Sequence, residues 1–305
     1  MSFKQEASQI MRGFFIFLML SVLVSCVSVS NLTTEKERTV TSTSIKDIAP
    51  QWAPFADGID YFHGDAASPK IKFRALRINL YAPGVEIVVK GGADGENNGG
   101  FLGAKVSSFV RDNNLAAGIN ASPFDVSSSK EGQPIKNIGI VVSEGKLLSP
   151  ANSRYDALVF YRDGKAAIVS QASIVSTENI ENAVGGFYRL LLDGEPTRRA
   201  KEDGQDENAA RHPRSAAGIS TDGKYLYLLV IDGRQAASIG ATEPETAALL
   251  SALGSHNAIN FDGGGSSALA LKFPDGKVKV VNTPVHKIFP GEERAVASCL
   301  GVRIE

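Results

Sequence analysis

An aspartate followed by three glycines and two serines stands at the end of an apolar run at 258–261. Because glycine loses the most backbone freedom on ordering, three in succession indicate a place where the backbone bends sharply or approaches a ligand closely. Consecutive N–H groups in such a bend form an anion-binding nest. We therefore predict a site for a substrate that carries both a phosphate and a sugar, in which Gly263, Gly264, Gly265, Ser266 and Ser267 bind the substrate and Asp262 places a carboxylate beside them.

Two other interpretations of this stretch have to be weighed. Asp-Gly is a common turn dipeptide, and the pairs at 163–164, 222–223 and 275–276 each separate two strand-like runs, which predicts hairpin turns there. A hairpin needs one glycine rather than three, which favours a site at Asp262. The spacing of Gly263, Gly265 and Ala268 also matches a dinucleotide fingerprint. That fingerprint must open a helix, and the five residues before the Pro274 turn leave no room for one, so we exclude nucleotide binding there.

Three shorter segments place polar side chains at the ends of predicted strands. Asn120 is expected to hold sugar hydroxyls with its amide, although asparagine is also a common turn residue. Arg214 offers a planar fork that suits a phosphate or a carboxylate, and a plain surface charge is the alternative. Asp232 and Arg234 close the strand-like run 225–231, where a carboxylate and a guanidinium are well positioned for a site. An internal ion pair is the alternative there.

Other chemistries find no support in the sequence. The four histidines, at 63, 212, 256 and 286, lack the spacing of zinc ligands. His212 is a candidate general acid or base, with a structural role as the alternative. A serine-hydrolase elbow and a Walker A loop are both missing from the sequence. No cofactor is therefore predicted, and a hard cation held jointly by Asp125, Asp232 and Asp262 is left open.

The N-terminus predicts a lipoprotein signal. Lys4 and Arg12 precede an apolar run at 14–24, which is too short for the roughly 20 helical residues that span a bilayer. The next residues, Leu23-Val24-Ser25-Cys26, resemble a bacterial lipobox, in which the chain is cleaved before a cysteine that is then lipidated; a plain signal peptide or a short anchor is the alternative. We expect a signal peptide at 1–25, lipidation at Cys26, and a protein held in the cell envelope by its lipid, facing the periplasm or the exterior.

Residues 26–50 are expected to form a flexible tether, because they are rich in serine and threonine and contain no aromatic residue. The remaining residues, 51–305, are numerous enough to bury a core without disulfides. The formal net charge is −1 at pH 7, from 32 Lys and Arg against 33 Asp and Glu. A nucleic-acid-binding protein needs a basic footprint, so no nucleic-acid partner is predicted.

Short strand-like runs separated by turn signals dominate residues 51–305, which indicates mainly antiparallel pairing. Helical character is confined to 104–113 and 243–253. In the second segment Thr242 and Glu245 have the spacing of a capping box, and that explains Glu245 without a catalytic role. We therefore predict an α+β fold in a single domain, with a mainly antiparallel or mixed sheet, many hairpins and a few helices.

The order of these motifs resembles the phosphodiester glycosidase family over about residues 71–302. This family includes the enzyme that removes N-acetylglucosamine from a phosphodiester to uncover mannose 6-phosphate, and bacterial members associated with exopolysaccharide biosynthesis. The feature most specific to this family is the glycine-rich motif at 260–267 together with its position after the Asp-Gly-Arg motif at 232–234. The supporting segments are 118–121, 213–219, 230–234, 240–245 and 294–296. The chain departs from the family pattern at 121–124, where glycines and aromatics usually follow the asparagine.

The resemblance implies hydrolysis of a sugar 1-phosphodiester at the anomeric carbon. On this basis Asp262 and Asp232 supply carboxylates near that carbon, and Arg214, Arg234 and the glycine nest hold the phosphate charge as it develops. Asn120 orients the sugar hydroxyls. The expected partner is a glycan or sugar phosphate. Two alternatives remain: a non-catalytic envelope lipoprotein that binds glycan phosphate, and a cation-dependent phosphodiester hydrolase that uses the same acids.

Overall fold

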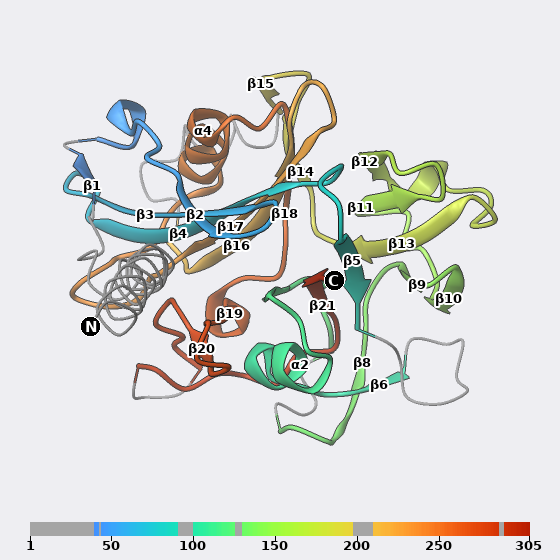
Figure 1. Ribbon diagram of the computed structural model, residues 1–305. Helices are drawn as coiled ribbons and strands as arrows, with labels where there is room; N and C mark the ends of the chain where they lie inside the picture. The colour runs from blue at the N-terminus through green and yellow to red at the C-terminus, as the bar shows by residue number, and fades with distance from the viewer. Residues whose placement is uncertain (1–39, 43, 91–99, 126–129, 198–209, 287–289) are drawn as a thin grey trace, which may run out of the picture. The chain divides into compact units, whose positions relative to one another are not determined.

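The computed structural model describes residues 40–42, 44–90, 100–125, 130–197, 210–286 and 290–305 (Figure 1). The predicted signal peptide, Cys26 and the first part of the predicted tether lie outside these residues. The chain divides into a unit at 1–39 and a unit at 40–305. All the elements named below belong to the second unit.

Three sheets and one short strand pair form this unit. The largest sheet has nine strands, in the order β1 (Val40–Ser42), β3 (Ile59–Ala66), β4 (Ile71–Asn79), β17 (Tyr225–Ile231), β16 (Arg214–Ile219), β18 (Asn257–Asn260), β14 (Arg189–Leu192) and β15 (Glu195–Pro196), with β2 (Ala53–Ala56) beside β3. The second contains β10 (Lys146–Ser149), β9 (Val141–Ser143), β13 (Ile180–Gly185), β11 (Asp156–Tyr161) and β12 (Ala166–Ser170). The third contains β20 (Val278–Val280), β19 (Leu269–Lys272), β7 (Ala117–Asn120), β21 (Cys299–Ile304) and β5 (Val85–Val89), and β6 (Gly100–Leu102) pairs with β8 (Pro134–Lys136).

The predicted fold class is confirmed. The described strands pair antiparallel everywhere except between β1 and β3. The three predicted Asp-Gly turns join β11 to β12, β16 to β17 and β19 to β20. The predicted helices are α2 (Val106–Asp112) and α4 (Glu243–Leu253), and short 3-10 turns occur at η1 (Ile45–Asp47), η2 (Gln171–Ser173) and η3 (Gly264–Ser266).

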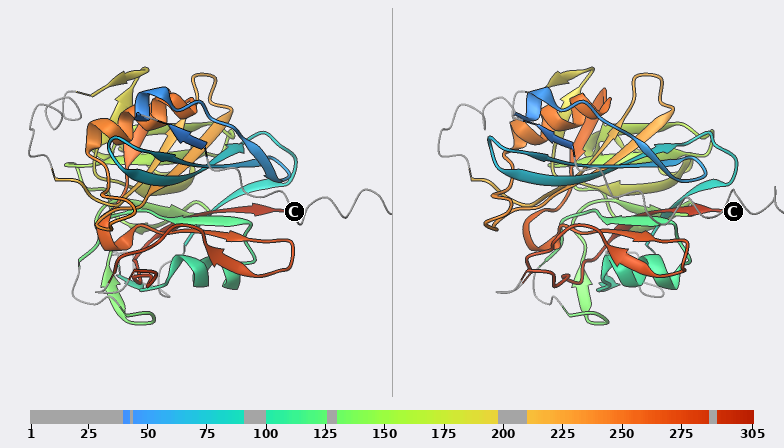
Figure 2. Two further views of the ribbon diagram at one scale, coloured as in Figure 1. Left: turned by 90° about the vertical axis from the view of Figure 1, so that its left-hand side faces the viewer. Right: turned by 60° about the vertical axis from the view of Figure 1, so that its left-hand side comes forward.

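The nine-stranded sheet is buried on both faces, which its central strand β17 shows clearly. Leu226, Leu228 and Val230 pack into the core shared with α2 and the third sheet. Tyr227 and Leu229 point to the opposite face, where α4 and η1 cover the sheet. Figure 2 shows these layers, with α4 on one side of the large sheet and α2 on the other. A strand that is apolar at nearly every position is therefore explained by burial on both sides.

Helix α4 begins where the sequence predicts. Thr242 Oγ1 accepts a hydrogen bond from the Glu245 N–H at 3.3 Å, and the Glu245 carboxylate accepts one from the Thr242 N–H at 2.9 Å. Gly254 ends the helix in a left-handed conformation, with φ 111°. The Arg211 guanidinium also forms a two-point ion pair with the Glu245 carboxylate. This pair ties the first turn of the helix to the segment that leads into β16.

The predicted boundary between tether and domain is corrected by the structure. Residues 40–42 form β1, which pairs in parallel with β3. Ile45 and Ile48 are buried in the core cluster that contains Leu249 and Leu253 of α4. The folded unit therefore includes residues 40–50, which were expected to belong to the tether. Composition missed this because two isoleucines in a serine- and threonine-rich segment are enough to anchor it.

Replacing Ile48 with alanine is expected to lower the free energy of unfolding by about 2–3 kcal/mol, because it leaves a cavity against α4. Ile239→Ala is the matched control, since Ile239 is 41% exposed; its cost is expected to stay within about 0.5 kcal/mol. Urea unfolding of both variants checks this. Equal costs would show that the segment at 44–50 contributes no packing.

Candidate active site

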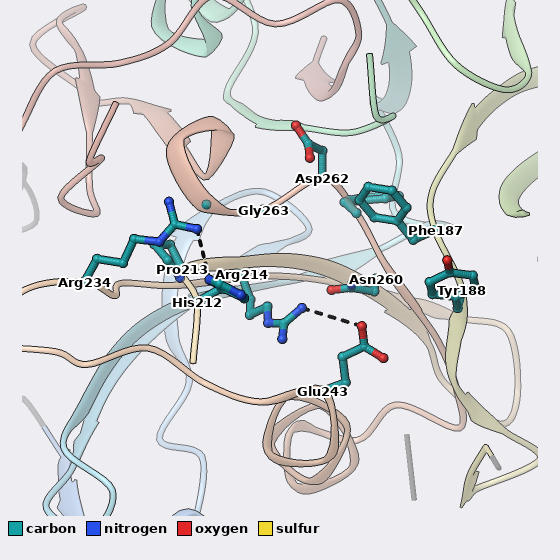
Figure 3. A pocket seen from close by; sticks show the side chains of 12 residues that line it. Phe187, Tyr188, His212, Pro213, Arg214, Arg234, Glu243, Asn260, Asp262 and Gly263 are labelled. Atoms are coloured by element: carbon teal, nitrogen blue, oxygen red, sulfur yellow. Dashed lines mark hydrogen bonds and ion pairs between the residues drawn. The ribbon is translucent and has the colours of Figure 1, made fainter. Parts of the chain in front are cut away.

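A pocket of about 380 Å³ opens where several strand ends of the nine-stranded sheet meet (Figure 3). Its lining comes from the approach to β14, the start of β16, the loop after β17, the first turn of α4 and the loop after β18. The lining residues are Phe187, Tyr188, His212, Pro213, Arg214, Arg234, Glu243, Asn260, Phe261, Asp262, Gly263 and Gly264. Five of the predicted site residues therefore meet in one cavity: Arg214, Arg234, Asp262, Gly263 and Gly264.

Strand register explains this convergence. β16 runs antiparallel to both of its neighbours, with Arg214 opposite Ile231 of β17 and Ala216 opposite Asn260 of β18. The first residue of β16 therefore lies at the same sheet edge as the last residues of β17 and β18. Segments about 20 and 46 residues farther along the chain, at 234 and 260, are brought beside Arg214 by pairing alone.

Asp262 leaves β18 and turns into the pocket. Its N–H donates to the Ala121 carbonyl at 2.9 Å, and the preceding Phe261 N–H donates to the Ser215 carbonyl at 2.9 Å. Burial raises the pKa of the Asp262 carboxyl to about 6. The Ser266 hydroxyl, the Arg294 guanidinium and the Gly263 N–H act in the opposite direction and lower it. A carboxyl group that titrates close to neutral pH is suited to acid–base chemistry.

The glycines after Asp262 let the loop pack closely against Pro213, and the backbone N–H of Gly264 is not free to bind a ligand. The Gly264 N–H, one of the predicted nest donors, donates to the Pro213 carbonyl at 2.9 Å. A Cβ on Gly263 would lie 2.7 Å from that same carbonyl oxygen, and Gly264 has φ 62°. The predicted nest over 263–265 is therefore corrected at Gly264, because that donor is used within the protein. Gly265 lies outside the lining, and Ser266 and Ser267 are buried behind the loop.

Arg234 forms one side of the pocket. It is one of the non-glycine residues with positive φ, at 57°, and its guanidinium lies over the glycine loop, 3.2 Å from where a Cβ on Gly264 would stand. Its Nη2 lies 2.9 Å from Nδ1 of His212. With the guanidinium donating, the neutral His212 ring carries its proton on Nε2. Arg234 and His212 thus form a joined polar wall.

Arg214 is buried at the base of this wall. Its Nε donates to the Ala241 carbonyl at 3.0 Å, and its Nη1 lies 3.7 Å from a carboxylate oxygen of Glu243. These contacts hold the guanidinium plane against the start of α4. The Glu243 carboxylate therefore balances the positive charge of Arg214 in the pocket, at a distance that is long for an ion pair.

The opposite side of the pocket is aromatic. The rings of Phe187 and Tyr188 stack with centroids 6.0 Å apart, and Tyr155 packs edge-on against both. Beside them the Asn260 side-chain oxygen is buried and has no hydrogen-bond partner among the described residues. An unpaired buried oxygen is costly, so this atom is a natural acceptor for a ligand hydroxyl.

Asp232 and Asn120 also lie outside the pocket lining. Asp232 is buried beside it, where its carboxylate accepts the Thr283 N–H at 2.7 Å and faces the Asn282 amide at 3.4 Å; burial raises its pKa. Asn120 is fully buried, and its amide donates to the Asp262 carbonyl at 2.6 Å while its oxygen accepts from Ser215 and from the Ala268 N–H. In this structure Asp232 anchors a neighbouring loop and Asn120 positions the loop that carries Asp262, and the roles assigned to them from the sequence stay predictions.

No group of three or more His, Cys, Asp or Glu side chains suited to a metal ion comes together among the described residues. Asp125, Asp232 and Asp262 therefore do not form the shared cation site that the sequence left open. In the described ranges no helix is long and apolar enough to cross a membrane.

The sequence profile of phosphodiester glycosidases matches residues 113–303. The chain belongs to the phosphodiester glycosidase family. That match covers well over half of the chain and contains every residue that lines the pocket.

Individual relatives agree with this assignment at the level of the fold. The catalytic domain of zebrafish N-acetylglucosamine-1-phosphodiester alpha-N-acetylglucosaminidase, in a structure auto-inhibited by its pro-peptide, superposes with a TM-score of 0.61 at 19% identity, covering 85% of this chain and 89% of that one. A protein from Synechocystis gives a TM-score of 0.63 at 16% identity, covering 85% and 64%. The SPbeta prophage-derived protein YomE of Bacillus subtilis is 28% identical over 201 residues, which are 65% of this chain and only 29% of that relative.

In this member of the phosphodiester glycosidase family, sequence reasoning missed several pocket residues. Glu243, Phe187 and Tyr188 were not singled out, and Asn260 was named only as part of the glycine-rich motif. Arg294 lies outside the lining, but its charge acts on Asp262, and it too was noted only as part of a motif. Tertiary packing alone brings the missed lining residues to the cavity.

Proposed function

We propose that this phosphodiester glycosidase hydrolyses a sugar 1-phosphodiester, with Asp262 acting at the anomeric carbon. The observation that supports this most directly is the pocket, in which a carboxyl group with a pKa of about 6 shares one cavity with two arginines. Guanidinium groups suit a phosphate, and a carboxylate suits the positive charge that develops on the sugar. Family membership points to the same class of reaction.

The polar wall is the proposed phosphate site. Arg214 is buried and held by the Ala241 carbonyl, while Arg234 is positioned by its contact with His212. Because Arg214 is buried and already held in place, stabilising the phosphate charge needs little reorganisation of that side chain.

The aromatic side is the proposed sugar site. Phe187 and Tyr188 offer apolar faces for the ring of a sugar, and Asn260 offers its unpaired oxygen to a hydroxyl. Asn260 thus takes the role that the sequence assigned to Asn120.

Cleavage of the bond between the anomeric carbon and oxygen passes through an oxocarbenium-like transition state. An ionised Asp262 beside the carbon stabilises the positive charge there, and the two arginines stabilise the negative charge on the departing phosphate. Since its pKa is about 6, Asp262 is mainly ionised at neutral pH.

The test is turnover of a panel of sugar 1-phosphodiesters by a soluble form that begins at Val27. An N-acetylglucosamine 1-phosphodiester comes first, because the name of the zebrafish relative specifies that linkage. Release of free sugar, with and without a chelator, is measured. Chelator-insensitive turnover supports the proposal. Tight binding of glycan phosphates without any hydrolysis supports the binding lipoprotein instead, and turnover lost on chelation supports the cation-dependent hydrolase.

We further propose that the enzyme works at the cell envelope on a glycan or exopolysaccharide, held by a lipid on Cys26. Cys26→Ser is expected to abolish incorporation of labelled fatty acid and to release the protein from membranes, because no other cysteine lies near the apolar segment. Cys299→Ser is the control: Cys299 is buried in the core, so lipidation should persist. Labelling that survives Cys26→Ser would contradict the lipobox.

A further inference from the structure

The pocket contains a second carboxylate that the proposed function has not used. Glu243 is the first residue of α4, and its side chain lines the cavity. In Figure 3 it enters the pocket from the side opposite Asp262. Glycoside hydrolysis generally uses two carboxyl groups that flank the bond to be broken. Asp232, which was expected to be the second, does not line the pocket, so Glu243 is the residue in position.

Glu243 stands next to the proposed phosphate site. Its carboxylate lies 3.7 Å from Arg214 Nη1, and only 14% of its side chain is exposed. In the empty pocket the Glu243 carboxylate balances the charge of the Arg214 guanidinium at the N-terminus of α4. A phosphodiester that binds Arg214 changes this balance. It takes a share of the guanidinium charge and brings its own negative charge close to the carboxylate, and two like charges at short range favour protonation of one of them.

We propose that Glu243 is the general acid of the site, taking up a proton when the phosphodiester binds and giving it to the oxygen that leaves the anomeric carbon. This rests on the proposed function. The bond between the anomeric carbon and the bridging oxygen breaks, its electron pair stays on that oxygen, and the Glu243 proton joins it to give a phosphomonoester. The hydroxyl of a water molecule ends on the anomeric carbon, and the proton of that water returns to solvent by way of Asp262. Glu243 is then ionised and again pairs with Arg214.

Several charged groups lie around Glu243. Arg214 reaches it from β16, Asp262 lines the same pocket from the loop after β18, and Glu245 is two residues along the same helix. The polar wall adds Arg234 and His212 from the far end of the pocket. Any pH dependence therefore has to be read as a difference between the wild type and a variant that lacks only the Glu243 proton site.

Glu243→Gln is that variant, and dimethyl phosphate is the probe, because it keeps one negative charge at every pH used. Its dissociation constant is measured by NMR titration across a pH series. Wild-type affinity is expected to weaken with rising pH, by up to about tenfold per unit for one linked proton. In Glu243→Gln we expect tighter binding at high pH and a slope smaller by one proton. With a hydrolysed member of the panel, kcat is expected to fall about 100-fold, which lies at the low end for loss of a general acid.

Glu245→Gln is the matched control on the same helical turn. It keeps the capping box, because glutamine also accepts the Thr242 N–H, but it removes the charge that pairs with Arg211, so it should lower the melting temperature while keeping the wild-type slope. Weaker dimethyl phosphate binding in Glu243→Gln would show that Glu243 only positions Arg214, and an unchanged kcat would remove the acid role while the proposed function stands. A wild type that hydrolyses nothing removes the proposed function and the acid role together.

Discussion

Replacing Asp262 with asparagine is expected to lower kcat by about 1,000-fold or more while the protein stays folded. Asparagine keeps the size and much of the hydrogen bonding of aspartate but cannot carry the negative charge that we assign to the anomeric carbon. Loss of a group that acts mainly in the transition state lowers kcat and leaves substrate binding nearly unchanged. Steady-state kinetics on the panel substrate, with dimethyl phosphate binding measured in parallel, separates the two effects.

The pKa of Asp262 gives this prediction a pH dependence with a definite sign. Burial raises the pKa to about 6, and the role requires the ionised form. Activity should therefore rise with pH through about 6 and then level off, until the loss of the Glu243 proton lowers it again. The free energy of unfolding should instead fall as pH rises. A carboxyl group whose pKa is raised on folding contributes its full stabilisation when the pH is below about 4, the pKa of that group in the unfolded chain. That contribution is lost as pH rises toward 6.

Asp262→Asn is accordingly expected to unfold at a temperature equal to or above that of the wild type at pH 7. Asp232→Asn is the control in the neighbouring loop: burial raises the pKa of Asp232 as well, and asparagine can still accept the Thr283 N–H, so the melting temperature should again be equal to or above that of the wild type at pH 7, with a smaller effect on kcat. Near-normal turnover in Asp262→Asn would make its carboxylate structural. It would also return Asp232 to consideration as a catalytic group.

Local features of the fold were predictable because each depends on a few adjacent residues. The Asp-Gly hairpins and the Thr242–Glu245 cap need only the residues within them, so the sequence contains the whole cause. The position of the glycine-rich loop at a strand end was predictable for the same reason. The residues that surround this loop could not be predicted from the sequence. They are set by the register of β16 against β17 and β18.

Asn120 and Asp232 were expected in the pocket and lie outside its lining, and the two cases have a common physical origin. Both are polar residues at strand ends, and a strand end is equally able to present a side chain to a pocket or to bind a neighbouring loop. Asn120 bridges the Asp262 carbonyl, Ser215 and Ala268, partners up to 148 residues away. Glu243 shows the reverse case, since a first-turn glutamate is fully explained by its helix until the fold places Arg214 beside it.

Gly264→Val is expected to damage binding and catalysis together, with kcat/KM lower by about 1,000-fold. Gly264 has φ 62°, a conformation that strains a β-branched residue by about 1–3 kcal/mol. Its side chain would also press on the Arg234 guanidinium, which lies 3.2 Å from the Cβ position. Relief of both strains moves the loop that carries Asp262. A shift of about 1 Å in a reacting group costs roughly 100-fold, and a weaker contact from Arg234 to the phosphate adds about another tenfold.

Gly164→Val is the matched control for strain alone. Gly164 has φ 83° in the turn between β11 and β12, with no atom within 4 Å of its Cβ position. Both variants should lose similar stability in urea unfolding, and only Gly264→Val should lose activity. Dimethyl phosphate binding separates the two active-site variants. Asp262→Asn should leave its affinity nearly unchanged, whereas Gly264→Val should weaken it. If Gly264→Val retained normal affinity for dimethyl phosphate, Arg234 would not belong to the phosphate site, and Arg214 would hold the anion alone.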